Sequence, residues 1–81
     1  MKLKVIYEDN HLLVVDKPIN VPMQLDSSND LDLLTMCKDY LKEKYNKPGN
    51  VYCALLHRLD RPVSGVCVFA KTSKAASRLS S

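Results

Sequence analysis

Apolar and polar positions alternate near the start of the chain, over residues 3–7, and an apolar run follows at residues 12–15. Alternation with a period of two is typical of a strand that buries one face. Asp9 and Asn10, which separate the two segments, favour a short turn, so the pattern predicts an antiparallel hairpin. Pro18 has no N–H to donate to a strand ladder and should end the second strand.

A helical period takes over in residues 30–46. Apolar side chains there recur with the i, i+3, i+4, i+7, i+8 spacing of a helix that packs on a core: Leu33, Met36, Cys37, Tyr40 and Leu41. Asn29 or Asp30 can cap the start of this helix, and Pro48–Gly49 should stop it. Residues 19–29 are rich in polar side chains and are expected to form a loop.

Two further apolar segments, residues 51–56 and 64–71, each predict a strand. Thr72 or Ser73 can cap a second helix that begins at Lys74. This succession of elements predicts an α/β (α+β) fold, in which a mixed, mainly antiparallel sheet carries one packed helix.

The length and the cysteines bound the class of protein. With 81 residues, the chain makes at most one small domain. Its cysteines, Cys37, Cys53 and Cys67, are odd in number and lie in apolar or helical patterns, which is typical of reduced, buried thiols in the cytoplasm. Their spacing contains no C-x-x-C pair, so a metal site is not expected. The sequence begins without the apolar core of a signal peptide and contains no run of membrane-spanning length, and we expect no membrane contact.

Charge is distributed unevenly along the sequence. Residues 1–56 hold seven Lys/Arg and eight Asp/Glu, whereas residues 57–81 hold five Lys/Arg and only Asp60 as an acid. A basic segment of this kind attracts polyanions, nucleic acid above all. On this ground RNA contact is expected to concentrate after residue 56. A chance gathering of surface lysines is the alternative.

The polar stretch HRLDRPVSG, residues 57–65, interrupts the two apolar segments. A plain turn does not require a histidine, two arginines and an aspartate together. Because a neighbouring cation favours a carboxylate over the acid, Asp60 should be ionised at neutral pH. A carboxylate on a loop held at both ends by strands can act as a nucleophile or a general base. Alternatively, Asp60 caps a backbone amide and pairs with an arginine in a purely structural turn.

The string HRLDRPVSGVCVFAKT, residues 57–72, resembles the central motif of the RluA-type pseudouridine synthases, H-R-L-D-x-x-T-S-G followed by apolar residues, Ala and Lys-Thr. The stretch YEDNHLLVVDKP is similar to the opening hairpin of the same family. Two departures are visible. Val63 stands where the family has Thr, and the segment INVPMQ lacks the Gly and His that usually follow the Lys-Pro pair.

The resemblance implies an RNA pseudouridine synthase, an isomerase that converts uridine to pseudouridine in ribosomal or transfer RNA without a cofactor or a metal. Asp60 takes the position of the catalytic aspartate, and Arg58 takes the position near the flipped nucleotide. His57 is expected either to contact RNA or to hold the loop by packing and hydrogen bonds. Arg61 and Lys71 are expected to attract phosphates, and an ion pair between Arg58 and Asp60 is the structural alternative.

The family's catalytic domain is more than twice as long as 81 residues. Residues 1–81 are therefore expected to be a truncated, N-terminal part of that domain, inactive by itself and prone to self-association through an incomplete sheet. A non-catalytic RNA-binding module or a structural fragment is the alternative function. The kinase catalytic loop H-R-D-L is excluded, because Leu59 and Asp60 are transposed and Gly65 stands where that loop has a metal-binding Asn.

Overall fold

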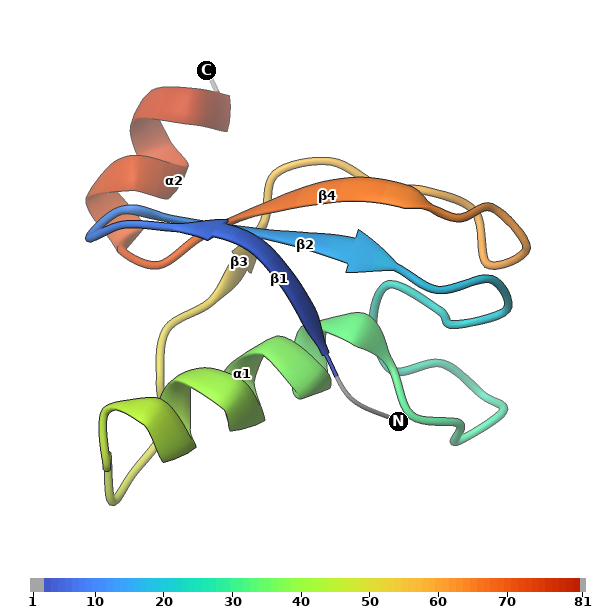
Figure 1. The fold of residues 1–81 in the computed structure, drawn as a ribbon, viewed down its shortest axis with the longest axis horizontal. Helices are drawn as coiled ribbons and strands as arrows, with labels where there is room; N and C mark the ends of the chain where they lie inside the picture. The colour runs from blue at the N-terminus through green and yellow to red at the C-terminus, as the bar shows by residue number, and fades with distance from the viewer. Residues whose placement is uncertain (1–2, 81) are drawn as a thin grey trace.

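The computed structural model describes residues 3–80. Four strands and two helices follow one another along the chain: β1 (Lys4–Glu8), β2 (Leu12–Lys17), α1 (Leu33–Lys44), β3 (Ala54–Leu55), β4 (Gly65–Ala70) and α2 (Ser73–Ser80). The strands form one sheet in the order β1-β2-β4-β3 (Figure 1), and all three pairings are antiparallel. The predicted α/β fold with a mainly antiparallel sheet is confirmed.

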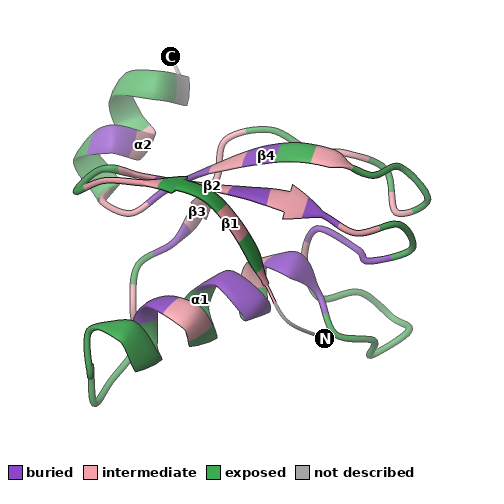
Figure 2. Cartoon of the chain, in the orientation of Figure 1, coloured by how far each residue is buried: buried purple, intermediate pink, exposed green. Residues whose placement is uncertain are grey.

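Helix α1 covers one face of the sheet, and the core lies between them (Figure 2). The strands contribute alternate residues of β2 and β4 to this core, and α1 contributes the predicted apolar stripe: Leu13, Val15, Cys67 and Phe69 from the sheet, and Leu33, Met36, Cys37 and Leu41 from the helix. All three cysteines are buried free thiols, as predicted. Within residues 3–80, neither helix has the length and apolar character to cross a membrane.

A β-bulge breaks the alternation in the first hairpin. Val5 pairs with Val15, but the next pair is Tyr7 with Val14, so one extra residue lies on β1. The bulge turns Tyr7 outward, where it is 52% exposed, and turns the Glu8 side chain inward, where it is 7% exposed. The simple period of two, which placed Tyr7 on the same face as Val5, is therefore wrong beyond the bulge.

Both ends of α1 differ from the prediction by a few residues. The cap is Asp32, whose carboxylate accepts a hydrogen bond from the Thr35 N–H at 2.9 Å. At the other end Asn46 adopts a left-handed φ of 51°, and the Lys47 N–H donates to the Lys42 carbonyl at 3.0 Å, which closes a Schellman motif. The helix thus ends at Lys44, four residues before Pro48.

The third strand is much shorter than the predicted 51–56, since only Ala54–Leu55 pairs with β4. On one side β4 has already ended, and the Lys71 N–H donates to the carbonyl of His11. On the other side the Val68 N–H donates to the His57 side chain rather than to a neighbouring strand. The second helix agrees with the prediction, because Thr72 Oγ1 caps α2 by accepting from the Ala75 N–H at 3.0 Å.

Candidate active site around Asp60

The motif loop runs from the end of β3 to the start of β4 and contains a tight turn directly after Asp60. The Val63 N–H donates to the Asp60 carbonyl at 2.9 Å. At the start of β4, Gly65 has a φ of 149°, a conformation that L-residues rarely adopt, and a Cβ there would lie 3.4 Å from Leu59 Cδ1. Glycine therefore allows the chain to pass from the motif loop into β4.

Lys17 holds this turn from beneath. Its side chain is fully buried at the end of β2, and Nζ donates to the carbonyls of Arg61 at 2.8 Å, Val63 at 2.6 Å and Pro18 at 3.2 Å. An ammonium group has three donors, so all of them are used. Because two of the acceptors flank Pro62, the ammonium fixes the backbone immediately after Asp60.

Burial lowers the pKa of Lys17, since an ammonium is less well solvated inside the protein than in water. The sequence pattern did not single out Lys17 as a site residue. A signal was present, however: in the alternation of β2, Lys17 stands in phase with the buried Leu13 and Val15. A lysine in the buried phase of a strand must find acceptors, and here they are the carbonyls of the motif loop.

Arg61 ties the motif loop to the segment of residues 18–32. Its Nε donates to the Asn20 carbonyl at 3.2 Å and its Nη1 to Ser28 Oγ at 3.1 Å, while Nη2 forms an ion pair with Asp30. The hydrogen bond with Asp30 raises the pKa of Arg61 further above its usual value. The charge of Arg61 is thus largely balanced within the protein, and its predicted attraction of phosphates remains a prediction.

His57 has a structural contact. Its Nε2 accepts a hydrogen bond from the Val68 N–H at 3.0 Å, so the ring proton of the neutral imidazole lies on Nδ1 in this arrangement. The contact takes the place of the strand pairing that ends at Leu55. It agrees with one of the two expectations for His57, that it holds the loop, and leaves contact with RNA as a prediction.

Asp60 and Arg58 are exposed and line a hollow of about 270 Å³. The other wall of the hollow is the segment of residues 22–26, which includes the half-buried Gln24. Within residues 3–80, neither the Asp60 carboxylate nor the Arg58 guanidinium has a hydrogen-bond or ion-pair partner, so the alternative of an Arg58–Asp60 pair is not found there. Both groups are available to a ligand.

The wall facing Asp60 is held by the start of α1. The Leu33 N–H donates to the Pro22 carbonyl at 2.8 Å, and the Leu34 N–H donates to the Met23 carbonyl at 2.9 Å. These two amides belong to the first turn of the helix, which has no partners for them within the helix. The segment that departs from the family pattern is therefore anchored on the protein core.

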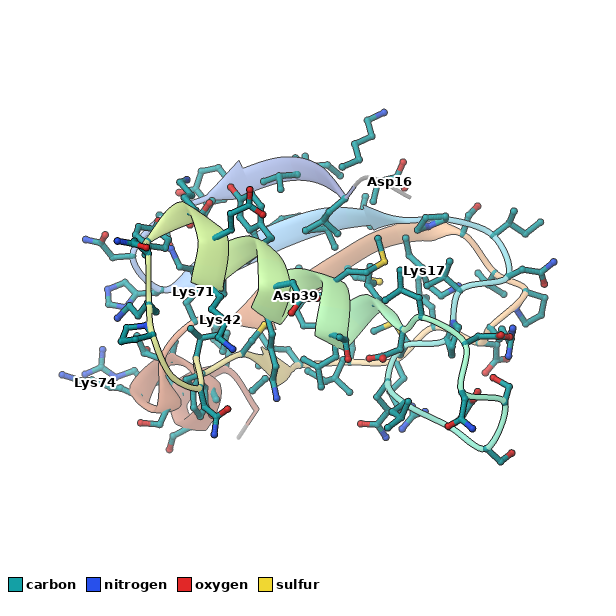
Figure 3. All side chains as sticks on the ribbon, turned by 90° about the horizontal axis from the view of Figure 1, so that it is seen from below. Asp16, Lys17, Asp39, Lys42, Lys71 and Lys74 are labelled. Atoms are coloured by element: carbon teal, nitrogen blue, oxygen red, sulfur yellow. The ribbon has the colours of Figure 1, made fainter. Side chains whose placement is uncertain are left out.

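Lys71 lies far from Asp60, at the opposite end of β4. The six residues of β4 span about 20 Å at about 3.3 Å per residue. Figure 3 shows Lys17, which underlies the motif loop, at the other end of the molecule from Lys71. Of the predicted site residues, the structure therefore brings His57, Arg58, Asp60 and Arg61 together and leaves Lys71 apart.

Around Lys71, a single carboxylate organises a polar cluster. Glu8 accepts hydrogen bonds from four side chains: Tyr40, Lys44, Tyr45 and Lys71. Burial raises the pKa of Glu8, but these four hydrogen bonds outweigh it and hold the pKa far below its usual range. The bulge in β1 is what turns Glu8 inward to meet them.

Comparison with known proteins decides the family. A family model described as RNA pseudouridylate synthase matches residues 11–81. The chain belongs to the RNA pseudouridylate synthase family. A dual-specificity RNA pseudouridine synthase RluA of Haemophilus influenzae is 40% identical over 79 residues, which cover 94% of this chain and 31% of the relative. An uncharacterized RNA pseudouridine synthase of Mycoplasma genitalium is 38% identical over 82 residues, which cover 96% of this chain and 25% of the relative.

The solved structures agree on the fold. The human RNA pseudouridylate synthase domain containing 4 superposes with a TM-score of 0.76 at 24% identity, over 94% of this chain and 27% of that one. The chain thus spans about a quarter to a third of the length of the pseudouridine synthases that it matches. Within residues 3–80, no group of three or more His, Cys, Asp and Glu side chains could hold a metal ion.

Proposed function

We propose that this chain carries the catalytic aspartate of an RNA pseudouridine synthase, which isomerises uridine to pseudouridine within RNA. The observation that supports this most strongly is the free Asp60 carboxylate beside a hollow, on a loop that Lys17 and Arg61 hold in place. A turn that served only to connect two strands would not need a buried lysine and an arginine that contacts three other residues. Such support is what a reacting carboxylate requires.

The reaction rearranges bonds without any change of oxidation state. The N1–C1′ glycosidic bond of uridine breaks, the uracil turns in place, and a bond forms between C5 and C1′, while a proton leaves C5 and N1 gains one. Asp60 either attacks C1′ or takes a proton from the sugar, and both routes need the carboxylate beside C1′. No cofactor takes part.

The other site residues receive matching roles. The target base must leave its stack to reach Asp60, at a cost of a few kcal/mol. Arg58, exposed and without a partner in residues 3–80, can fill the vacated stack or hold a phosphate, since its guanidinium is planar and always charged. His57 and Arg61 keep the loop in shape and border the bound RNA, and Lys71 attracts a more distant phosphate.

We infer ribosomal or transfer RNA as the substrate and the cytoplasm as the place of action. The H. influenzae relative is named a dual-specificity RNA pseudouridine synthase, and a Pseudomonas aeruginosa relative, 32% identical over 98% of this chain and 24% of its own length, is named a ribosomal large subunit pseudouridine synthase. Free, buried cysteines support a reducing compartment.

The 81 residues by themselves are proposed to be an inactive, N-terminal part of the catalytic domain. No aromatic residue lines the hollow beside Asp60 within the described part of the chain, so nothing there would stack on the uracil. The sheet also leaves Ile6 50% and Val66 57% exposed, which supports self-association of the isolated chain and can be checked by sedimentation. RNA binding without catalysis is then what the isolated chain should display.

A chimera tests the proposed function. The matching 79 residues of the H. influenzae enzyme are replaced by this chain, and pseudouridine is quantified in unmodified RNA. We expect the chimera to be active and the 81-residue chain alone to be inactive. In the chimera, Asp60→Asn should abolish product, whereas Asp26→Asn, a carboxylate on the same hollow, should leave most of the activity. Pseudouridine formation that survives Asp60→Asn would refute the assignment.

A further inference from the structure

Two hollows that are not lined by any residue of the motif loop share part of their walls. The first, of about 320 Å³, lies between the end of α1, the β1–β2 turn and the junction of β4 with α2, and Lys47, Lys71 and Tyr52 are among its lining residues. The second, of about 380 Å³, lies along α1 beside Lys38 and Lys42. Residues 50–51 border both hollows, so they form one surface, which we call the lysine groove.

The cations of the lysine groove follow one another along it. Lys38 and Lys42 are four residues apart on α1 and therefore share one face of the helix. Lys47 closes the Schellman motif at the end of α1, and Lys71 directly follows β4. Lys38, Lys42 and Lys47 are exposed and have no ion-pair partner within residues 3–80.

Few acids oppose these lysines. Asp39 borders the second hollow, and no acidic residue lines the first within the described part of the chain. Glu8 forms ion pairs with both Lys71 and Lys44, so these three residues together keep a net positive charge. The groove therefore attracts anions.

Charge is segregated between the two ends of the sheet. Six basic and three acidic residues gather at the end near the β1–β2 turn: Lys42, Lys44, Lys47, Lys71, Lys74 and Arg78 against Glu8, Asp9 and Glu43. Four basic and five acidic residues gather at the other end: Lys4, Lys17, Arg58 and Arg61 against Asp16, Asp26, Asp30, Asp32 and Asp60. Figure 3 shows Lys42, Lys71 and Lys74 together at the first end and Lys17 and Asp16 toward the second.

This segregation bears on how a polyanion is held. The Asp60 end has a net charge of −1 by the residues just named, so it cannot supply the long-range attraction that RNA binding needs. The groove end has a net charge of +3 by the same count. The comparison of charge between residues 1–56 and 57–81 does not reveal this basic end, because the groove combines lysines of α1 with Lys71.

The lysine groove also carries groups that suit unpaired bases. Tyr52 lines the first hollow and is 46% exposed, and the amide side chains of Asn10 and Asn50 border the same hollow. An exposed aromatic ring beside lysines is the arrangement with which proteins bind single strands, because bases of any sequence stack on the ring while the cations hold the backbone.

We propose that the lysine groove binds the phosphodiester backbone of single-stranded RNA, with Tyr52 stacking on a base. This contact lies apart from the hollow at Asp60 and holds the RNA while the target uridine is at the other end of the sheet. The proposal rests on the proposed function only in taking RNA as the substrate.

The test measures binding of a fluorescein-labelled, uridine-rich single-stranded RNA of 12 nucleotides to the 81-residue chain by fluorescence anisotropy. The groove variant is Lys42→Gln/Lys47→Gln, and the control with the same charge change is Lys4→Gln/Arg58→Gln. Each single-strand phosphate contact contributes about 0.7 to the slope of log K against log salt, so two lost contacts lower the slope by about 1.4. This corresponds to about 25-fold weaker binding at 0.1 M salt if binding is equal at 1 M.

The control is expected to lose at most one contact, that of Arg58, or about fivefold. Tyr52→Leu should weaken binding, and Tyr52→Phe should not, because only the ring is needed for stacking. The proposal is overturned if the wild-type chain does not bind the RNA, or if the groove variant loses no more than the control. Circular dichroism establishes that each variant is folded.

The two proposals can fail separately. A chimera that makes pseudouridine while the groove variant binds RNA like the wild type would leave the proposed function standing and remove the groove. If binding depends on the groove but the chimera stays inactive, the groove proposal stands and the proposed function fails.

Discussion

Replacing Lys17 with methionine should separate the support of the motif loop from its chemistry. Methionine keeps most of the unbranched stem of lysine and removes the ammonium group. The carbonyls of Pro18, Arg61 and Val63 then lose their donor. The side chain of Lys17 is fully buried, so solvent does not reach the position of its ammonium group unless the loop moves.

The expected loss of stability follows from two opposing effects. A fully buried carbonyl left without a donor costs about 1–3 kcal/mol, and because the three carbonyls here are only partly buried, their combined cost stays below about 9 kcal/mol. Removing the ammonium also removes its desolvation penalty, which is several kcal/mol. We therefore expect a net loss of about 2–4 kcal/mol. A domain of 81 residues has a free energy of unfolding of about 4–12 kcal/mol, so the loss is a large share of it.

Urea unfolding followed by circular dichroism gives the free energy, and hydrogen exchange of the Val63 amide gives the local effect. That amide donates to the Asp60 carbonyl within the turn, so its exchange should accelerate more than that of core amides. Lys38→Met, at an exposed position of α1, is the matched control and should change stability by less than about 0.5 kcal/mol. A Lys17→Met protein as stable as the wild type, with unchanged Val63 exchange, would refute the role of the ammonium.

The pH dependence gives a second readout. Burial lowers the pKa of Lys17 in the folded state, so between that pKa and the unfolded value of 10.5 the unfolded chain binds more protons. The free energy of unfolding should therefore gain a component that rises with pH through this window. Lys17→Met should lack that component.

Two further substitutions test features around the site. Gly65→Ala should destabilise the chain by about 1–3 kcal/mol, because its φ of 149° is a conformation that L-residues rarely adopt, whereas Gly49→Ala, with nothing within 4 Å, should be nearly neutral in thermal unfolding. Glu8→Gln should cost about 1–3 kcal/mol at pH 7, because it breaks two ion pairs of a nearly buried carboxylate. Because the pKa of Glu8 is held low in the folded state, the stabilisation by its carboxylate is present above the unfolded pKa and is lost as pH falls toward the folded pKa. The unfolding free energies of the wild type and Glu8→Gln should therefore converge in acid. A difference between them that stays constant from pH 7 to pH 2 would contradict this.

Much of the fold could be predicted because local patterns carry it. The apolar stripe of α1 and the alternation of β2 record which face each element buries, and both faces meet in the core as expected. The motif around Asp60 is also local, since nine consecutive residues between two strands hold it. Its neighbours His57, Arg58 and Arg61 come close to Asp60 simply because they are adjacent in the sequence.

Features that depend on distant partners could not be predicted in the same way. Periodicity placed Tyr7 on the buried face, but the bulge in β1 gave that place to Glu8, since pairing with β2 shifts by one residue there. The strand predicted for residues 51–56 shrank to Ala54–Leu55 because β4 ends at Ala70 and leaves it no longer partner. Strand pairing depends on two segments of the chain, so the sequence of one segment alone does not determine which residues pair.

The same division applies to the site. The sequence by itself pointed to Asp60 as the candidate carboxylate, and it determined the family to which the motif belongs and the helix that packs on the sheet. Only the tertiary structure decided that Lys17, 43 positions before Asp60 in the sequence, supports the turn, that the acids of residues 26–30 balance Arg61, and that Lys71 joins the lysines of α1. Charges and hydrogen bonds act over a few ångströms in space, and the folding of the sheet alone determines which residues come within that distance.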